Sequence, residues 1–161
     1  MKLIVGLGNP CQKYKNNRHN VGHHFIDYLI NELTSSRING FKLYKTDCYM
    51  NLSGKFVKKL IRNPQSVNEQ LIIVHDDLDI PLGKFKIQKG TGPLLHNGIE
   101  SIENVLGTKD FWRVRIGVDN RQQTGQVDGE TYVLTDFRPE EMTVVNQVFV
   151  TAYKQLLTLF K

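Results

Sequence analysis

The apolar run Leu71–Val74 is the feature that most constrains the fold of this chain. Its four residues are all aliphatic, and an uninterrupted apolar run of this length is typical of a strand that is buried on both faces of a parallel sheet. His75, Asp76 and Asp77 follow it directly. Because ligands of such sheets bind at the carboxyl ends of the strands, the run predicts an internal strand with a functional site at its end.

The remaining segments alternate between strand-like and helix-like patterns, as in α/β proteins. Further strands are predicted at Lys2–Val5, Phe41–Tyr44, Lys84–Gln88, across the alternating Val114, Ile116 and Val118, and at Tyr132–Leu134. Helices are predicted after His19, from Leu52 to Ile61, from near Gly98, and from Pro139. We therefore expect one α/β domain over residues 1–161, a sandwich with a mixed, mainly parallel central sheet flanked by helices.

The predicted helix after His19 has a clear apolar face. That face consists of Val21, Phe25, Tyr28, Leu29 and Leu33. Asn20 is a candidate for the N-cap, because its side-chain oxygen can accept a hydrogen bond from the first turn. The final helix has a similar stripe, made of Val145, Val148, Phe149, Ala152 and Leu156.

Composition limits the class of protein. A chain of 161 residues with 40% hydrophobic content and a formal charge of +5 suits one compact core and an anionic partner. Two cysteines, Cys11 and Cys48, are too few for a disulfide framework and indicate a reducing compartment. No apolar run approaches the roughly 18 residues that cross a bilayer. We expect no membrane association and a cytoplasmic location, with an organellar matrix left open.

The segment GLGNPCQKYKNNRHNVG, residues 6–22, is the first candidate for chemistry. Its two leading glycines resemble a dinucleotide-binding loop, but the third glycine and an acidic ribose partner are missing. His19 has polar neighbours at the mouth of a predicted helix, which favours an exposed, titratable base. Position alone leaves an ordinary surface histidine equally open.

The segment IIVHDDLDIPLG, residues 72–83, offers two interpretations. Its aspartates could bind a divalent metal together with His75. We favour the other interpretation, in which Asp76 accepts the Nδ1 proton of a histidine and fixes its tautomer, as the acid of a serine-protease triad does. Asp77 and Asp79 are then expected in a solvated turn before Pro81.

Two further segments carry amides at predicted helix starts. In DCYMNLSG, Met50 and Asn51 precede a helix, and in LHNGIESI, His96 and Asn97 do so. Each asparagine could cap its helix or hold a substrate, and His96 could be a surface residue or face a nucleotide.

Taken in order, GLGNP with RHNVG, YMNLSG, VHDDLDIPLG, HNG and RVRIGV make the chain resemble the bacterial-type peptidyl-tRNA hydrolase family over essentially its whole length. The resemblance implies an enzyme without cofactor or metal that hydrolyses the ester between a peptide and the 3′ end of tRNA and so recycles the tRNA. It makes His19 the catalytic base, Asp76 its orienting partner and Asn9 a group that stabilises charge. The implied substrate-binding residues are Tyr14, Met50, Asn51, His96 and Asn97. The candidates for tRNA phosphate contacts are Lys84, Lys86 and Arg115.

The chain departs from the family pattern at several points. Glycine usually stands at Cys11, threonine at Asn17, and a glycine-rich loop where this chain has Pro93-Leu94-Leu95. We expect Leu94 and Leu95 either to cover the cleft or to pack inward and displace the residues that follow them. The stretch from Leu33 to Met50 is also short and is expected to lack a strand or hairpin.

An alternative function remains open at this stage. Relatives of the family use the same fold as non-catalytic RNA-binding proteins, such as splicing factors, and the altered loop could reflect lost catalysis. Retention of Asn9, His19 and Asp76 favours the enzyme. A monomer is expected in either case.

Overall fold

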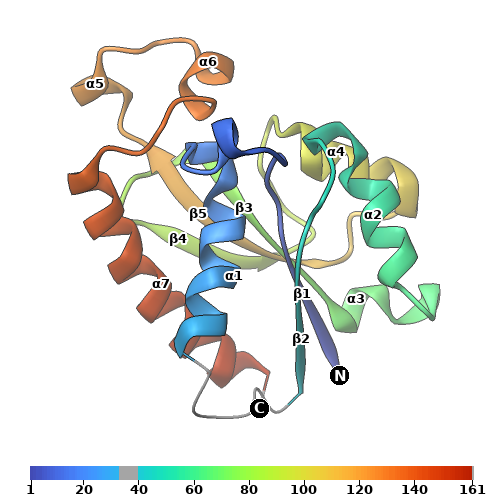
Figure 1. Ribbon diagram of the computed structural model, residues 1–161. Coiled ribbons are helices and arrows are strands. Elements are labelled where there is room, and N and C mark those ends of the chain that lie inside the picture. Colours follow the sequence, from blue (N-terminus) through green and yellow to red (C-terminus); the bar gives the residue numbers. More distant parts are fainter. Residues whose placement is uncertain (33–39, 161) are drawn as a thin grey trace.

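The computed structural model describes residues 1–32 and 40–160 (Figure 1). Its strands are β1 (Lys2–Gly6), β2 (Phe41–Lys45), β3 (Leu71–Pro81), β4 (Phe85–Lys89) and β5 (Trp112–Asp119). Its α-helices are α1 (Val21–Glu32), α2 (Ser53–Leu60), α3 (Val67–Gln70), α4 (Asn97–Leu106), α5 (Arg121–Thr124), α6 (Gly129–Val133) and α7 (Pro139–Leu159). Short 3₁₀ turns lie at Gln12–Tyr14, Arg18–Asn20, Met50–Leu52 and Pro64–Ser66.

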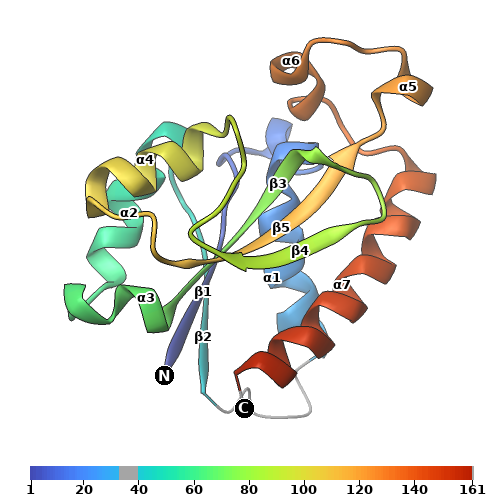
Figure 2. The same ribbon diagram turned by 180° about the vertical axis from the view of Figure 1, so that it is seen from behind.

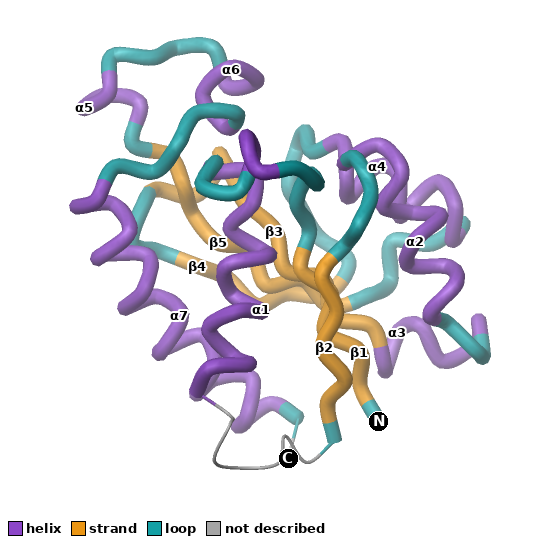
Figure 3. The backbone as a smooth tube through the Cα atoms, viewed as in Figure 1, coloured by secondary structure: helices purple, strands orange, loops and turns teal. Residues whose placement is uncertain are grey.

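The five strands form one sheet in the order β2-β1-β3-β5-β4 (Figure 3). The pairs β1–β2, β1–β3 and β3–β5 are parallel, whereas β4 runs antiparallel to β5. The expectation of a single-domain α/β fold with a mixed, mainly parallel sheet is therefore confirmed. Strand β3 lies in the middle of the sheet, as its apolar run predicts.

Side chains of β3 alternate between two hydrophobic cores, which explains the unbroken apolar run. Ile72 and Val74 pack with α1 and α7 on one face, while Leu71 and Ile73 pack with α2 and α4 on the other. Figures 1 and 2 show these helix pairs on opposite sides of the sheet. Successive side chains of a strand point to opposite faces, so a strand covered on both sides is apolar at every position.

Glycine at position 22 lets α1 approach the sheet. A Cβ atom there would lie 2.4 Å from the carbonyl oxygen of Val74 and 2.5 Å from the amide nitrogen of Leu7. Those distances exclude a side chain, so Gly22 fixes how closely the first turn of α1 packs over β1 and β3. This contact positions the residues just before α1 beside the middle of β3.

Two sequence expectations differ from the structure or lie outside it. Tyr132–Leu134 was expected as a strand, but Tyr132 and Val133 belong to helix α6. The reason is the cap: the Asp128 side chain accepts hydrogen bonds from the backbone amides of Glu130 and Thr131, which starts a helical turn. Leu33, predicted on the apolar face of α1, lies outside the described residues.

Strand β3 begins at Leu71 as predicted but continues to Pro81, seven residues beyond Val74, so His75, Asp76 and Asp77 lie within the strand and do not follow its end. The remaining predicted elements are confirmed within one or two residues at their ends. The apolar stripe of α7 is buried as predicted, from Val145 to Leu156. No helix among the described residues is long and apolar enough to cross a membrane.

Candidate active site

His19 and Asp76 meet near the middle of β3, just past the level at which the neighbouring strand β1 ends. The Nδ1 atom of His19, in the turn before α1, lies 2.9 Å from both carboxylate oxygens of Asp76. Asp76 is 2% exposed and His19 8% exposed. A carboxylate accepts only, so Nδ1 carries the proton and donates it, and Nε2 is left with its lone pair. The sequence predicts this pair, but it places His19 on the surface, whereas the structure buries most of the ring.

The His19 environment raises the pKa of this imidazole above its ordinary value. Burial alone would lower it, but the charge of Asp76 and its hydrogen bond to Nδ1 together exceed that effect. For Asp76, burial likewise opposes ionisation, and the two neighbouring histidines hold the pKa of the carboxyl well below its usual range. His19 Nε2 has no hydrogen-bond partner among the described residues, and it is not among the buried polar atoms that solvent cannot reach. It is therefore the free basic atom of the pair.

Arg18 anchors the turn that carries His19. Its guanidinium donates to a carboxylate oxygen of Glu141 at 2.6 Å, and both side chains are almost completely buried. It also lies 4.2 Å from the ring centre of Tyr132 and bonds the hydroxyl of Thr135. Glu141 closes the capping box at the start of α7. These contacts tie the His19 backbone to α6 and α7, a role that the sequence did not indicate because the partners are over 110 residues apart.

Asn9 is held from two sides. Its backbone N–H donates to the Asn20 side-chain oxygen and its carbonyl accepts from the Asn20 amide, both at 2.9 Å. Its own Oδ1 accepts from the backbone N–H of Met50 at 2.8 Å. The expectation that Asn20 caps α1 is wrong, because its side chain is used on this loop. Asn9 Nδ2 has no hydrogen-bond partner among the described residues and is not among the buried atoms that solvent cannot reach. It is therefore available as a donor in the site.

His96 bonds the same carboxylate beside His19. Its Nε2 atom lies 2.8 Å from Asp76 Oδ1, and its ring centre lies 4.9 Å from that of His19. Its Nδ1 atom accepts from the backbone amides of Gly98 and Ile99 at 3.1 and 3.2 Å, so His96 is the N-cap of α4. The alternative in which Asn97 is the cap is therefore wrong. Position in the sequence suggested proximity for His96 but not its bond to Asp76.

His75 lies behind this group and was not predicted as part of it. It is completely buried, its Nδ1 donates to the Asp76 carbonyl oxygen at 2.7 Å, and its Nε2 has no partner. Burial, followed by the proximity of His96, lowers its pKa to about 3. His75 is therefore neutral at physiological pH.

Asp77 and Arg115 correct two expectations. Asp77 is 1% exposed inside β3, rather than part of a solvated turn, and accepts from Arg115 Nε at 2.7 Å. Arg115 also bonds the Gln88 side chain at 2.6 Å and is 7% exposed. The guanidinium is therefore internal and unsuited to a phosphate contact. Lys84 and Lys86 are exposed at and beside β4, as such contacts require.

The other expected substrate residues surround the His19–Asp76 pair at different depths. Met50 is buried against α4, where a Cβ on Gly98 would lie 2.5 Å from its sulfur atom. Asn51 and Asn97 are exposed at the starts of the two helices. Tyr14 is half-buried, with its ring edge-to-face with that of Tyr49 at 6.3 Å between centres. Tyr49 was not singled out in the sequence.

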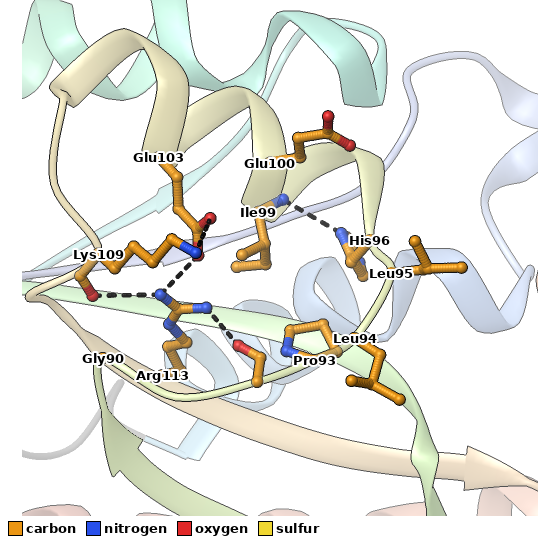
Figure 4. Close-up of a pocket in the computed structure, with 11 residues that line it drawn as sticks. Gly90, Pro93, Leu94, Leu95, His96, Ile99, Glu100, Glu103, Lys109 and Arg113 are labelled. Carbon is orange, nitrogen blue, oxygen red and sulfur yellow. Dashed lines mark hydrogen bonds and ion pairs between the residues drawn. The ribbon is translucent and has the colours of Figure 1, made fainter.

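A cavity of about 310 Å³, which Figure 4 shows, lies between the loop before His96 and helix α4, and His96 is one of the residues that line it. Arg113 forms its floor and bonds the Gly92 carbonyl, the Glu103 carboxylate and the Lys109 carbonyl. Leu94 and Leu95 are 87% and 89% exposed. They do not pack inward, and His96 is not displaced, so that part of the expectation is wrong.

Three groups of the site are of the kinds that bind metal ions. His19, Asp76 and His96 have ligand-type atoms within 4.8 Å of one another. The Asp76 oxygens, however, already accept from the two rings at ordinary hydrogen-bond lengths, so a cation would have to displace two ring protons. The alternative metal site with Asp77 and Asp79 is not supported, because Asp77 is paired with Arg115. The donor set fits a hydrogen-bonded network.

An imidazole oriented by a buried carboxylate, with its second nitrogen free, is the arrangement of a hydrolase that activates its attacking group by general-base catalysis. The model of the family described as peptidyl-tRNA hydrolase matches residues 3–161. This chain belongs to the peptidyl-tRNA hydrolase family.

Individual relatives agree with that assignment. The peptidyl-tRNA hydrolase of Lawsonia intracellularis is 36% identical over 99% of this chain and 87% of its own length. That of Campylobacter curvus is 43% identical over 88% of this chain and 80% of its own length. Among solved structures, the peptidyl-tRNA hydrolase of Acinetobacter baumannii superposes with a TM-score of 0.81 at 28% identity, over 99% of this chain and 88% of the other.

These similarities confirm the expected family and the expected class, a hydrolase acting on an ester bond. The alternative of a non-catalytic RNA-binding relative has no support from them. The individual roles of the site residues remain predictions.

Proposed function

We propose that this chain hydrolyses the ester between a peptide, or an N-blocked amino acid, and the 3′ end of tRNA, with His19 as the base. The observation that carries the proposal is the His19–Asp76 pair, in which Nδ1 is bonded and Nε2 is free. An aminoacyl ester is already activated, so a positioned water and a base of suitable pKa suffice, without a serine or cysteine nucleophile.

In this mechanism, His19 Nε2 takes a proton from water while the water oxygen attacks the ester carbonyl carbon. The carbonyl oxygen becomes an oxyanion, to which Asn9 Nδ2 donates a hydrogen bond. Collapse of the intermediate breaks the bond to the ribose oxygen, which receives the proton from His19. The products are the free 3′ hydroxyl of tRNA and the peptide carboxylate, whose remaining proton from water is released to solvent. Asp76 keeps its charge throughout and stabilises the transient imidazolium.

Substrate binding is assigned to the residues around this pair. Met50 would supply an apolar wall, Tyr14 would line the cleft, and Asn51, Asn97 and His96 would face the substrate. Lys84 and Lys86 would contact tRNA phosphates without reading sequence; Arg115 is withdrawn from this group. We further propose a monomer that acts in the cytoplasm or an organellar matrix.

The test is turnover of an N-blocked aminoacyl-tRNA by the purified chain, with and without EDTA. Release of the blocked amino acid and deacylated tRNA in both samples supports the proposal. Retention of tRNA without cleavage would instead indicate a binding protein, and loss of turnover in EDTA that a divalent ion restores would indicate a metal enzyme.

A further inference from the structure

The carboxylate of Asp76 serves two histidines, and only one of them is the base in the proposed mechanism. His19 Nδ1 donates at 2.9 Å to both oxygens, and His96 Nε2 donates at 2.8 Å to Oδ1. All three side chains are nearly buried, with side-chain exposures of 10%, 3% and 3% for His19, Asp76 and His96. Water therefore cannot easily replace either bond.

The backbone of α4 fixes which ring nitrogen of His96 is the donor. Its Nδ1 accepts from two backbone amides at the helix start, Gly98 N–H and Ile99 N–H. A ring nitrogen that accepts hydrogen bonds carries no proton, so the neutral ring must carry its proton on Nε2 and donate it to Asp76. The hydrogen bonds of His96 therefore hold its Nε2 atom as a donor to Asp76.

We propose that His96 is a positioning residue, which orients the Asp76 carboxylate and takes part of its hydrogen-bonding capacity away from His19. This inference rests on the proposed function only in that His19 is taken as the base. It replaces the assignment of His96 as a direct substrate contact.

Two consequences follow from sharing one carboxylate. The bond from His96 holds the carboxylate plane so that both of its oxygens face His19 Nδ1. The bond from His96 also lowers the basicity of Asp76. A carboxylate that already accepts one hydrogen bond attracts the proton on His19 Nδ1 less strongly. Without His96, Asp76 would hold the proton of His19 imidazolium more tightly, and less of the enzyme would carry a free base near neutral pH.

The other titratable or charged groups near this network are bonded elsewhere or exposed. Four form ion pairs on the elements packed against His19 and His96: Asp27 with Lys45, Arg18 with Glu141, Asp77 with Arg115, and Glu103 with Arg113. Four form other hydrogen bonds: His23 with Thr46, His24 with the Lys15 carbonyl, His75 with the Asp76 carbonyl, and Tyr132 with the Val118 carbonyl. The exposed groups are Lys15, Glu32, Glu100 and Glu130. Asp76 is thus the carboxylate that faces both rings.

The loop that precedes α4 is connected to the hydrogen bonds of Asp76 through His96. His96 follows Leu95, and Figure 4 shows the His96–Ile99 bond at the point where the loop enters α4. Displacement of the loop would therefore change the hydrogen bonding of Asp76 without any contact between the loop and His19.

Two substitutions separate the two bonds of His96. His96→Asn places an amide oxygen near the position of Nδ1, so it keeps an N-cap but loses the donor to Asp76. His96→Gln places an amide N–H near the position of Nε2, so it keeps that donor but loses the cap. His24→Asn is the matched control, because His24 bonds the Lys15 carbonyl rather than a carboxylate.

The primary measurement is the pKa of His19 by NMR titration of the folded, substrate-free protein, with the signal assigned by its loss in His19→Ala. We expect His96→Asn to raise this pKa by about one unit, a tenfold change that corresponds to one hydrogen bond to a charged group. The acid limb of the kcat/KM profile should move to higher pH by the same amount. His96→Gln should keep the pKa close to wild type while lowering Tm, and His24→Asn should not move it.

An unchanged His19 pKa in folded His96→Asn would overturn the proposal, and so would equal shifts in the Asn and Gln variants. A purely structural role would lower the whole rate profile without moving its acid limb. Because the titration needs no substrate, a shift in a protein that fails to cleave peptidyl-tRNA would refute the proposed function and leave this inference standing.

Discussion

Replacing Asp76 by asparagine tests how the site holds its base. The carboxylate accepts from two rings, but asparagine has only one acceptor oxygen, and its amide nitrogen is a donor. If the oxygen keeps the bond from His96, the amide nitrogen donates to His19 Nδ1 and favours the tautomer with the proton on Nε2. The lone pair that attacks the water proton is then lost.

The magnitude follows from the buried geometry. Without the carboxylate, burial remains as the main influence on His19, so its raised pKa should fall below the ordinary value. Wrong tautomer and lost charge together should lower kcat by on the order of 10²–10⁴-fold, the range for losing general-base catalysis. Stability should fall by about 1–3 kcal/mol, because hydrogen bonds to a buried carboxylate are replaced by weaker bonds between neutral groups.

The assay is single-turnover hydrolysis of N-blocked aminoacyl-tRNA, with ¹⁵N NMR to read the His19 tautomer.

The pH dependence of the free energy of unfolding of the wild type has a defined sign. Asp76, with its depressed pKa, stabilises the wild type above the unfolded pKa of about 4, and this contribution is lost as pH falls. His19, with its raised pKa, stabilises below about 6.5 and loses this contribution as pH rises. For the substitution itself, a folded Asp76→Asn variant with kcat within threefold of wild type would refute the reasoning.

Three further changes have expected outcomes. Lys84→Gln with Lys86→Gln should weaken tRNA binding and reduce the slope of log Kd against log salt by roughly two, with hydrolysis of a minimal ester substrate unchanged; an unchanged slope would exclude these lysines. Cys11 has a φ of +82°, so Cys11→Gly should relieve strain and raise stability by about 1 kcal/mol in chemical denaturation, and a loss of stability would contradict this. Leu94→Gly with Leu95→Gly should lower stability only slightly, because both side chains are exposed, and should raise kcat/KM if the leucines obstruct substrate; a slower, folded variant would show that they assist binding.

The sequence predicted those parts of the fold and site that depend on local pattern. The apolar run of β3, the stripe of α7 and the two residues His19 and Asp76 are examples. Patterns alone could not determine which partners side chains choose across the chain. Tyr132–Leu134 is apolar enough for a strand, but the Asp128 cap makes a helix there.

The same limit applies to the polar residues. Asn20 is a reasonable cap, yet it is used by Asn9, which is 11 residues away. Arg115 has the charge of a phosphate contact but is paired with Asp77 across neighbouring strands, a fact set by the β3–β5 register. The bond of His96 to Asp76 depends on how the loop enters α4, and no spacing in the sequence encodes it.

The most direct test of the central claim is kcat/KM for an N-blocked aminoacyl-tRNA, measured for wild type and His19→Ala with tRNA affinity measured in parallel. If His19 is the base, the variant should lose on the order of 10²–10⁴-fold in kcat while its fold and its Kd for tRNA remain close to wild type. Turnover near the wild-type rate by the well-folded variant would contradict the account.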